Sequence, residues 1–326
     1  MALDIAYTNG VIAAREKYLL KERIYRLCEL SAEEAFRMLL ESGFGGGAET
    51  ATGVYDYEKL IAVEEERLDA FIREYAPKKG IAAYLLSPRD FHNAKALIKA
   101  AHTGESADRM LAPDGLIAAD TLKTCVQSGD FSEVKEACPK LAKACEEAVA
   151  LLEVEPSGAK LGAIFERASF EHLKECVKGV GVLKKLLAAK ADMTNILTAL
   201  RSADSESAKE GYLPVGKLTE TELDALFDTD SEKAQAAFSK TPYAEFVKAC
   251  FAARDKGLPM TEAEKLRDGY DTAYFAARKY ELESCEPFLY YIYRRKAENA
   301  NVRIVFVCLL AGLDEQDIKR RLRAKE

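Results

Sequence analysis

The amino-acid sequence predicts an all-α protein. Apolar residues recur at spacings of three and four along nearly the whole chain, as in Leu60, Ile61 and Leu68, and this period is typical of amphipathic helices. Alternating runs of Val, Ile and Thr, which would indicate strands, are almost absent. The sequence therefore indicates one helix after another.

Helix starts are marked by capping boxes, and the connections are short. Ser31 with Glu34, and Thr219 with Glu222, place a hydroxyl and a carboxylate where they can satisfy the first turn of a helix. The segments between helices are built from Gly, Pro, Ser and Asp, as in "LAPDGL" and "YLPVGK".

Composition indicates a globular protein and argues against some partners. The chain has 326 residues, of which 48% are hydrophobic, enough for two or three packed domains. Its 47 basic and 54 acidic residues give a net charge of −7, which argues against electrostatic binding to nucleic acid.

The eight cysteines are scattered, with no C-x-x-C pair and no His at zinc-finger spacing, so we expect free thiols in a reducing cytoplasm. The start of the chain lacks a signal-peptide pattern. The longest uncharged apolar stretch, residues 304–313, is about half of what a bilayer crossing needs. We expect membrane association only through a partner.

A segment repeats three times. "DFHNAKALIKAA", "DMTNILTALRSA" and "ENANVRIVFVCL" align Asn93 with Asn195 and Asn301, at intervals of 102 and 106 residues. Apolar residues follow each Asn at plus one, four, five and eight, which is one helical face. They are Ala94, Leu97, Ile98 and Ala101; Ile196, Ala199, Leu200 and Ala203; and Val302, Val305, Phe306 and Leu309.

This period is long enough for each unit to hold its own core. We predict three similar helical domains, at residues 1–104, 105–206 and 207–326, in a pseudo-threefold, funnel-like arrangement suited to a coaxial partner. The threefold arrangement is inferred from the number of copies alone.

His92, between Asp90 and Asn93, is a candidate general base. The other copies carry Thr194 and Ala300 at its position, which favours a structural role for this segment. Asp90 and Asp192 are interpreted as N-cap or first-turn acids. The aligned Asn is interpreted as a buried amide at a helix start that bonds neighbouring backbone, with ligand contact as the alternative.

Other motifs favour ordinary structural roles. The glycine-rich "GFGGGAET" at residues 43–50 follows a helix and lacks Gly-Lys-Ser/Thr, so a flexible loop is favoured over a phosphate cradle. Cys138 and Cys145 have no His close by and are expected to pack in a core. The charged runs at residues 64–67 and 264–268 are interpreted as solvated faces. We expect no catalytic residue, cofactor or metal site.

Basic residues gather near the end of the chain. They are candidates for contact with an acidic partner or anionic lipid, and dipole complementation at a helix end is the alternative. The candidates are Arg294, Arg295, Arg320, Arg321 and Arg323.

Four segments in order make the chain resemble a known family. "YTNGVIAAREKYLL", "SPRDFHNAKALIKA", "FERASFEHL" and the C-terminal "EPFLYYIYRRKAENANVRIVFVCLLAGLDEQDIKRRLR" resemble the C subunit of V/A-type ATPases and ATP synthases. The eukaryotic counterpart is called the d subunit. The resemblance covers essentially the whole chain.

The resemblance implies a non-catalytic rotor subunit of the central stalk, peripheral to the membrane on its cytoplasmic side. Its implied partners are the membrane-embedded proteolipid ring and the shaft subunits D and F. It would transmit torque between ATP turnover and ion transport. Two other interpretations are a helical scaffold unrelated to a rotary ATPase and an enzyme with a site around His92 and Asp90.

Overall fold

The computed structural model describes residues 4–20, 22–49, 51–228, 230–281 and 283–323. Throughout these ranges the secondary structure is helical and contains no strand, so the all-α prediction is confirmed. Among the described residues, no helix combines the length and hydropathy that crossing a bilayer requires. The chain divides into two compact units, Met1–Lys78 with Lys265–Glu326, and Lys79–Glu264.

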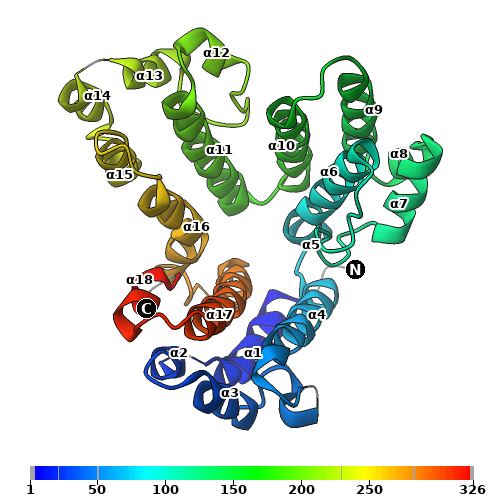
Figure 1. Ribbon diagram of the computed structural model, residues 1–326, viewed down its shortest axis with the longest axis vertical. Helices are drawn as coiled ribbons and strands as arrows, with labels where there is room; N and C mark the ends of the chain where they lie inside the picture. Colours follow the sequence, from blue (N-terminus) through cyan, green and yellow to red (C-terminus); the bar gives the residue numbers. More distant parts are fainter. Residues whose placement is uncertain (1–3, 21, 50, 229, 282, 324–326) are drawn as a thin grey trace. The chain divides into compact units, whose positions relative to one another are not determined.

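The first unit, hereafter the terminal unit, combines both ends of the chain (Figure 1). Its helices are α1 (Ile5–Arg15), η1 (Glu16–Tyr18), α2 (Arg23–Leu27), α3 (Ala32–Glu41), η2 (Phe44–Glu49), η3 (Val54–Asp56), α4 (Tyr57–Tyr75), α17 (Glu286–Leu310) and α18 (Glu315–Arg321). Helix α16 (Thr261–Ala276) crosses the boundary between the units.

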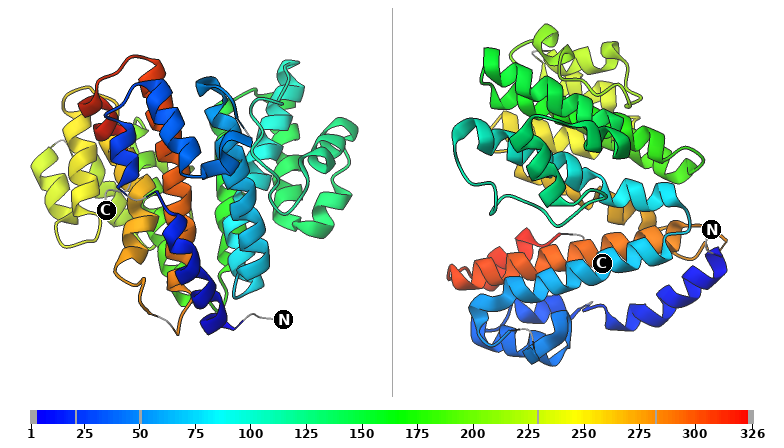
Figure 2. Two further views of the ribbon diagram at one scale, coloured as in Figure 1. Left: turned by 90° about the horizontal axis from the view of Figure 1, so that it is seen from below. Right: turned by 90° about the vertical axis from the view of Figure 1, so that its right-hand side faces the viewer.

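Helices α4 and α17 run side by side through the terminal unit, in light blue and orange in Figure 2. Between them and α2, α3 and α18 lies a core that contains Leu60, Ile61 and Phe306. Phe306 stacks on Tyr57 with ring centroids 5.2 Å apart. The apolar spacing predicted a buried face on each helix, and the structure shows that these two faces pack in the same core.

The second unit, hereafter the central unit, is continuous in sequence. Its helices are α5 (Lys79–Leu86), α6 (Pro88–Thr103), α7 (Ala119–Ser128), α8 (Ser132–Ala137), α9 (Pro139–Val154), α10 (Gly158–Cys176), α11 (Gly181–Arg201), α12 (Ser205–Lys209), α13 (Glu220–Asp224), η4 (Ala225–Phe227), α14 (Ser231–Phe238) and α15 (Ala244–Arg254).

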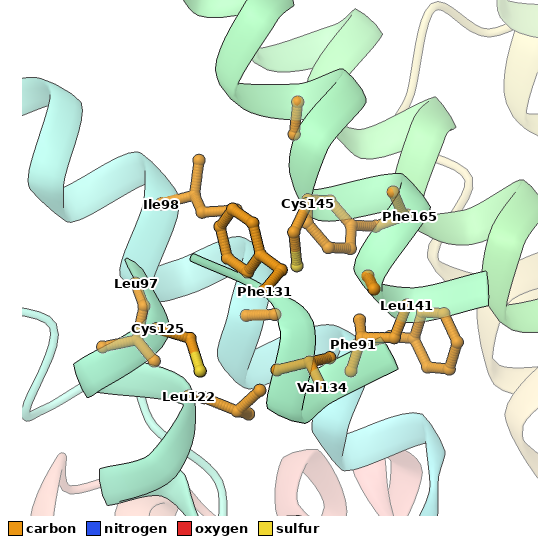
Figure 3. Packing of buried hydrophobic residues seen from close by; sticks show 14 of the residues in the cluster. Phe91, Leu97, Ile98, Leu122, Cys125, Phe131, Val134, Leu141, Cys145 and Phe165 are labelled. Carbon is orange, nitrogen blue, oxygen red and sulfur yellow. The ribbon is translucent and has the colours of Figure 1, made fainter. Parts of the chain in front are cut away.

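One core of the central unit is assembled around α6. Figure 3 shows side chains from α6, α7, α8, α9 and α10 converging there. Phe91 and Ile98 come from α6, Cys125 from α7, Cys145 from α9 and Phe165 from α10.

The two compact units are defined by contacts in the structure, whereas the three predicted domains are defined by repeats in the sequence. The division into three repeat domains and their threefold arrangement therefore stay predictions.

The repeated apolar stripe is buried over most of its length. The plus-one and plus-four residues of all three copies are buried, as are Ile98 and Phe306 at plus five, where Leu200 is half-buried. Ala101 and Ala203, at plus eight, are exposed. Ala101 lies in the last turn of α6, and α11 ends at Arg201, so the stripe runs out where these helices end.

Both predicted capping boxes are present. The Ser31 hydroxyl accepts a hydrogen bond from the Glu34 backbone N–H, and the Glu34 carboxylate accepts one from the Ser31 N–H. Thr219 and Glu222 make the same reciprocal pair at the start of α13. Each box satisfies backbone donors that a helix leaves free at its first turn.

The glycine-rich segment after α3 forms a tight turn in place of the flexible loop that its composition predicted. Gly45 has φ +61°, and a Cβ added to it would lie 2.3 Å from the backbone oxygen of Leu60 on α4. Its N–H donates to the Glu64 carboxylate at 2.9 Å. A residue without a Cβ is required here because the turn packs directly on a helix backbone.

Candidate functional site

Each of the three aligned asparagines clamps a backbone segment that follows it in the sequence. The side-chain amide donates to a carbonyl oxygen, and its own oxygen accepts from the N–H of the same residue. The clamped residues are Ala112 (3.1 and 2.8 Å) for Asn93, Leu213 (3.1 and 2.7 Å) for Asn195 and Arg323 (2.9 and 2.7 Å) for Asn301. The bonds to neighbouring backbone that the structural interpretation of the Asn expects are therefore present in all three copies.

The position of the Asn within its helix differs from the expectation of a helix start. Asn93 lies in the second turn of α6, but Asn195 and Asn301 lie well inside α11 and α17. All three are buried. A buried amide that bonds both the N–H and the C=O of one residue avoids the cost of leaving them unpaired, wherever it lies along the helix.

An acid three residues before each Asn completes the clamp in the first two copies. Asp90 accepts hydrogen bonds from the N–H groups of Leu116 (3.0 Å) and Ile117 (3.1 Å). Because residues three apart lie on the same helical face, Asp90 and Asn93 both bond the same loop.

In the second copy, Asp192 accepts from the N–H groups of Lys217 (2.6 Å) and Leu218 (2.9 Å) and from the Tyr243 hydroxyl (2.7 Å). The interpretation of Asp192 as a cap or first-turn acid was wrong, because it lies inside α11, where the charge of a helix end does not reach. Asp90 does lie in the first turn of α6. The recurring acid at minus three was a sequence signal for this role that the alignment on the Asn alone missed.

A glycine in each of the first two clamped loops leaves room for the acid. A Cβ on Gly115 would lie 2.2 Å from Asp90 Oδ1, and a Cβ on Gly216 would lie 2.4 Å from Asp192 Oδ1. The two loops, "LAPDGL" and "YLPVGK", therefore share an acid-to-backbone contact that any side chain would obstruct. We call this arrangement of acid, Asn and glycine loop the double clamp.

The third copy uses its acid differently. Glu298, three residues before Asn301, accepts from the Leu20 N–H and forms an ion pair with Arg295. Arg295 also pairs with Glu64 of α4. The three charged residues are 5 to 8% exposed. In place of a downstream loop, this acid holds together segments from the two ends of the chain.

Two interpretations based on the sequence change with this ion pair. Arg295 belongs to the interior of the terminal unit, whereas the basic segment suggested a surface position for it. The charged run at residues 64–67 was interpreted as a solvated face, and for Glu64 this was wrong, because its side chain is buried. Removing one partner of such a buried pair typically costs about 3 to 5 kcal/mol, because the remaining charge stays buried without compensation.

A cavity of about 600 Å³ lies beside this ion pair. Among the described residues, its walls carry five cationic side chains and the single carboxylate of Glu64. The cationic residues are Arg15, Lys17, Arg23, Arg67 and Arg295. Sequence reasoning missed this cluster because its members come from α1, η1, α2, α4 and α17.

The other basic candidates lie at or near the surface of the terminal unit. Arg320 pairs with Asp317, and Arg323 pairs with Asp268. Arg320 and Arg321 are exposed and lie in the last turn of α18, where positive charge complements the helix dipole. Arg294 is half-buried.

A family model described as the ATP synthase (C/AC39) subunit matches residues 8–321. The chain belongs to this family. The double clamps, the buried ion pair and the cationic cavity all fall inside the matched range, so they are features of a member of the C/AC39 family.

Curated proteins of similar sequence carry related names. The chain is 20% identical to the C subunit of the V-type sodium ATPase of Enterococcus hirae over 280 residues, 82% of each protein. It is 26% identical to the C subunit of the V-type ATP synthase of Thermus thermophilus over 225 residues, 66% of this chain and 68% of that protein. The same values hold for a second strain of that organism. The resemblance stated from the four sequence segments is confirmed.

In this C/AC39 family member, His92 and Asp90 have separate structural partners. His92 Nε2 lies 2.8 Å from the Met110 carbonyl oxygen, while both Asp90 oxygens accept backbone N–H bonds. His92 is exposed and Asp90 is buried. Neither side chain is arranged to activate a nucleophile through the other, and the structural interpretation of the segment fits better.

The cysteines are free thiols, as expected, and Cys138 and Cys145 pack in a core, as predicted. Cys138 has a histidine close by in space: His172 Nδ1 lies 3.4 Å from its Sγ, and His172 Nε2 lies 3.3 Å from Cys176 Sγ. Burial lowers the pKa of the His172 imidazole. Within the described ranges, no group of three or more His, Cys, Asp or Glu could hold a metal ion.

Proposed function

We propose that this chain is the non-catalytic central-stalk rotor subunit of a V/A-type ATPase or ATP synthase. In this role it links the shaft, subunits D and F, to the proteolipid ring of the membrane sector and transmits torque for ion transport. The observation that carries the proposal is the family match over residues 8–321, which includes nearly the whole chain. The names of the relatives from Enterococcus and Thermus support it.

The internal geometry is suited to a mechanical part. A torque-bearing body has to resist deformation, and each unit contains buried polar contacts that fix one element to another. Asn93 and Asn195 fix loops to α6 and α11, and Arg295 joins α17 to α4. Buried and fully satisfied hydrogen-bond networks hold such elements in one arrangement.

The proposed placement is peripheral to the membrane, with three repeat domains forming a funnel that receives the shaft on one side and the ring on the other. The exposed basic residues Arg320 and Arg321 are proposed as part of a partner contact. Their charge would attract an acidic surface of the shaft or ring, with an effect that weakens as salt screens it.

Reconstitution of the rotary complex tests the proposal. We expect a complex assembled without this chain to retain ATP hydrolysis by its head but to lose ATP-driven ion transport, because the rotor is then uncoupled from the ring. Restoring the chain should restore transport. Failure of the chain to bind either D and F or the detergent-solubilised ring would overturn the assignment.

The basic contact needs a separate test. Replacing Arg320, Arg321 and Arg323 by Ala should weaken pull-down of the shaft or ring, most clearly at low salt. Because Arg323 is also held by Asn301 through its backbone, circular dichroism should first show that the variant remains folded. Unchanged pull-down and coupling in the folded variant would dismiss this contact and leave the rotor assignment intact.

A further inference from the structure

The proposed rotor function does not involve the cationic cavity of the terminal unit. Its volume, about 600 Å³, lies within the range of small-molecule sites. Five cationic side chains face it in a protein whose net charge is −7. Positive charge is therefore concentrated at this cavity, although the molecule as a whole is negatively charged.

The lining carboxylate of Glu64 is already occupied. Glu64 accepts hydrogen bonds from the Gly45 N–H at 2.9 Å and from Arg67 at 2.8 Å, and it pairs with the buried Arg295. Because these donors share its two oxygens, Glu64 has little capacity to neutralise further cations in the cavity.

Two lining arginines have no carboxylate partner among the residues that the structure describes. In that part of the chain, no ion pair joins Arg15 or Arg23 to an acidic side chain. The Arg15 guanidinium lies over the Phe71 ring, with its central carbon 4.6 Å from the ring centroid. This cation–π contact holds the guanidinium beside the ring, and the N–H groups that do not bond the Tyr291 hydroxyl can donate to another partner.

We propose that this cavity binds a small molecule that carries two or more phosphoryl groups. Arginine forks match the oxygens of a phosphoryl group, and several guanidinium groups converging on one cavity suit an anion with more than one phosphoryl group. The cavity is also larger than a single inorganic anion requires. Arg15 and Arg23 supply donors from α1 and α2. The charge of Arg295 is balanced by Glu64 and Glu298, so Arg295 forms part of the wall without adding to the attraction. This site is independent of the rotor proposal.

Calorimetric titration of the full-length chain with pyrophosphate tests the site. Arg23 is exposed and lines the cavity, whereas Arg26 is exposed on the same helix, α2, and does not line it. We expect Arg23→Gln to weaken pyrophosphate binding roughly tenfold, the effect of losing one charge-assisted contact. Arg26→Gln should change binding by less than about twofold, because it removes the same charge outside the cavity.

Two results would overturn the proposal. One is the absence of saturable binding at millimolar pyrophosphate in low salt. The other is equal weakening by Arg23→Gln and Arg26→Gln, which would indicate diffuse attraction to the surface of α2. Both variants replace exposed side chains, so loss of folding does not confuse the comparison, and circular dichroism verifies this.

Discussion

Asn195 and Leu213 are joined by two hydrogen bonds: Asn195 Nδ2 donates to the Leu213 carbonyl at 3.1 Å, and the Leu213 N–H donates to Asn195 Oδ1 at 2.7 Å. The pair is buried, and it recurs at Asn93 and Asn301 with different partners. The Asn195 side chain thus bonds the N–H and C=O of a loop residue, as backbone groups would within a helix. We expect this pair of hydrogen bonds to stabilise the central unit.

Replacing Asn195 by Leu should destabilise the protein by about 2 to 4 kcal/mol, because the Leu213 N–H and C=O would stay buried without partners. Urea unfolding followed by circular dichroism measures the change. Thr194→Ala, next to it on α11 and only half-buried, is the control and should have a much smaller effect. Equal midpoints for Asn195→Leu and the wild type would show that the clamp does not contribute to stability.

Gly115→Ala should destabilise the protein, because the added Cβ would lie 2.2 Å from Asp90 Oδ1 and push the carboxylate away from its two N–H donors. We expect a loss of about 1 to 3 kcal/mol. Gly162→Ala is the matched control. Gly162 lies inside α10 with nothing within 4 Å of an added Cβ, so this change should stabilise by about 0.5 to 1 kcal/mol. Thermal unfolding of the two variants should therefore shift in opposite directions.

Arginines at two positions of α17 pair with acids of α4, one pair buried and one exposed. Arg295→Met should cost about 3 to 5 kcal/mol, because it leaves Glu64 and Glu298 buried together without their shared cation. Arg303→Met, which breaks the exposed pair with Glu58 at 2.9 Å, should cost less than about 1 kcal/mol.

Denaturant unfolding of both variants measures the difference. Adding Glu64→Gln to Arg295→Met should recover part of the loss, since it removes one of the stranded charges. If Arg295→Met and Arg303→Met cost the same, burial does not determine the strength of these pairs.

Stability should fall on acidification through the His172 imidazole. Its pKa is lowered in the folded state by burial, so below about pH 6.5 the unfolded chain binds a proton that the folded protein resists. The contribution is fully present above the unfolded pKa and is lost as the pH falls towards the folded one. Free energies of unfolding measured between about pH 7.5 and pH 5.5 should therefore decrease more steeply in the wild type than in His172→Phe.

His102 is the control for this measurement. It is exposed at the end of α6, and His102→Gln should leave the slope of stability against pH unchanged. A wild-type slope identical to that of His172→Phe would contradict the role assigned to His172.

Local and periodic features of this protein could be predicted from its sequence. The helices follow from apolar spacing, and the capping boxes at Ser31 and Thr219 follow from contacts within one turn, where the partners are three residues apart. The three aligned asparagines were found because a repeat preserves residue types at fixed spacing. Their bonding to backbone was expected on chemical grounds, and the family resemblance was carried by the same segments.

The partners of these residues could not be predicted from the chain in the same way. Spacing does not specify which backbone Asn195 clamps, that Glu64 is buried against Arg295, or that Cys138 meets His172. Glu64 and Arg295 are 231 residues apart, and nothing local distinguishes them from the exposed Glu66 and the half-buried Arg294 beside them. The cationic cavity is a still larger assembly, drawn from five helical elements.

The sequence by itself therefore determined the all-α class and the helices, because these depend on hydrogen bonds and apolar spacing within a few residues. It also showed the three asparagines, because the repeated segments can be aligned without knowledge of their partners. Only the tertiary structure decided which charges are buried and which loops are clamped, because those outcomes depend on how distant helices pack. Burial changes the energy of a charge far more than its neighbours in sequence do. For that reason Arg295, which the sequence made a candidate for contact with an acidic partner or anionic lipid, is buried inside the terminal unit.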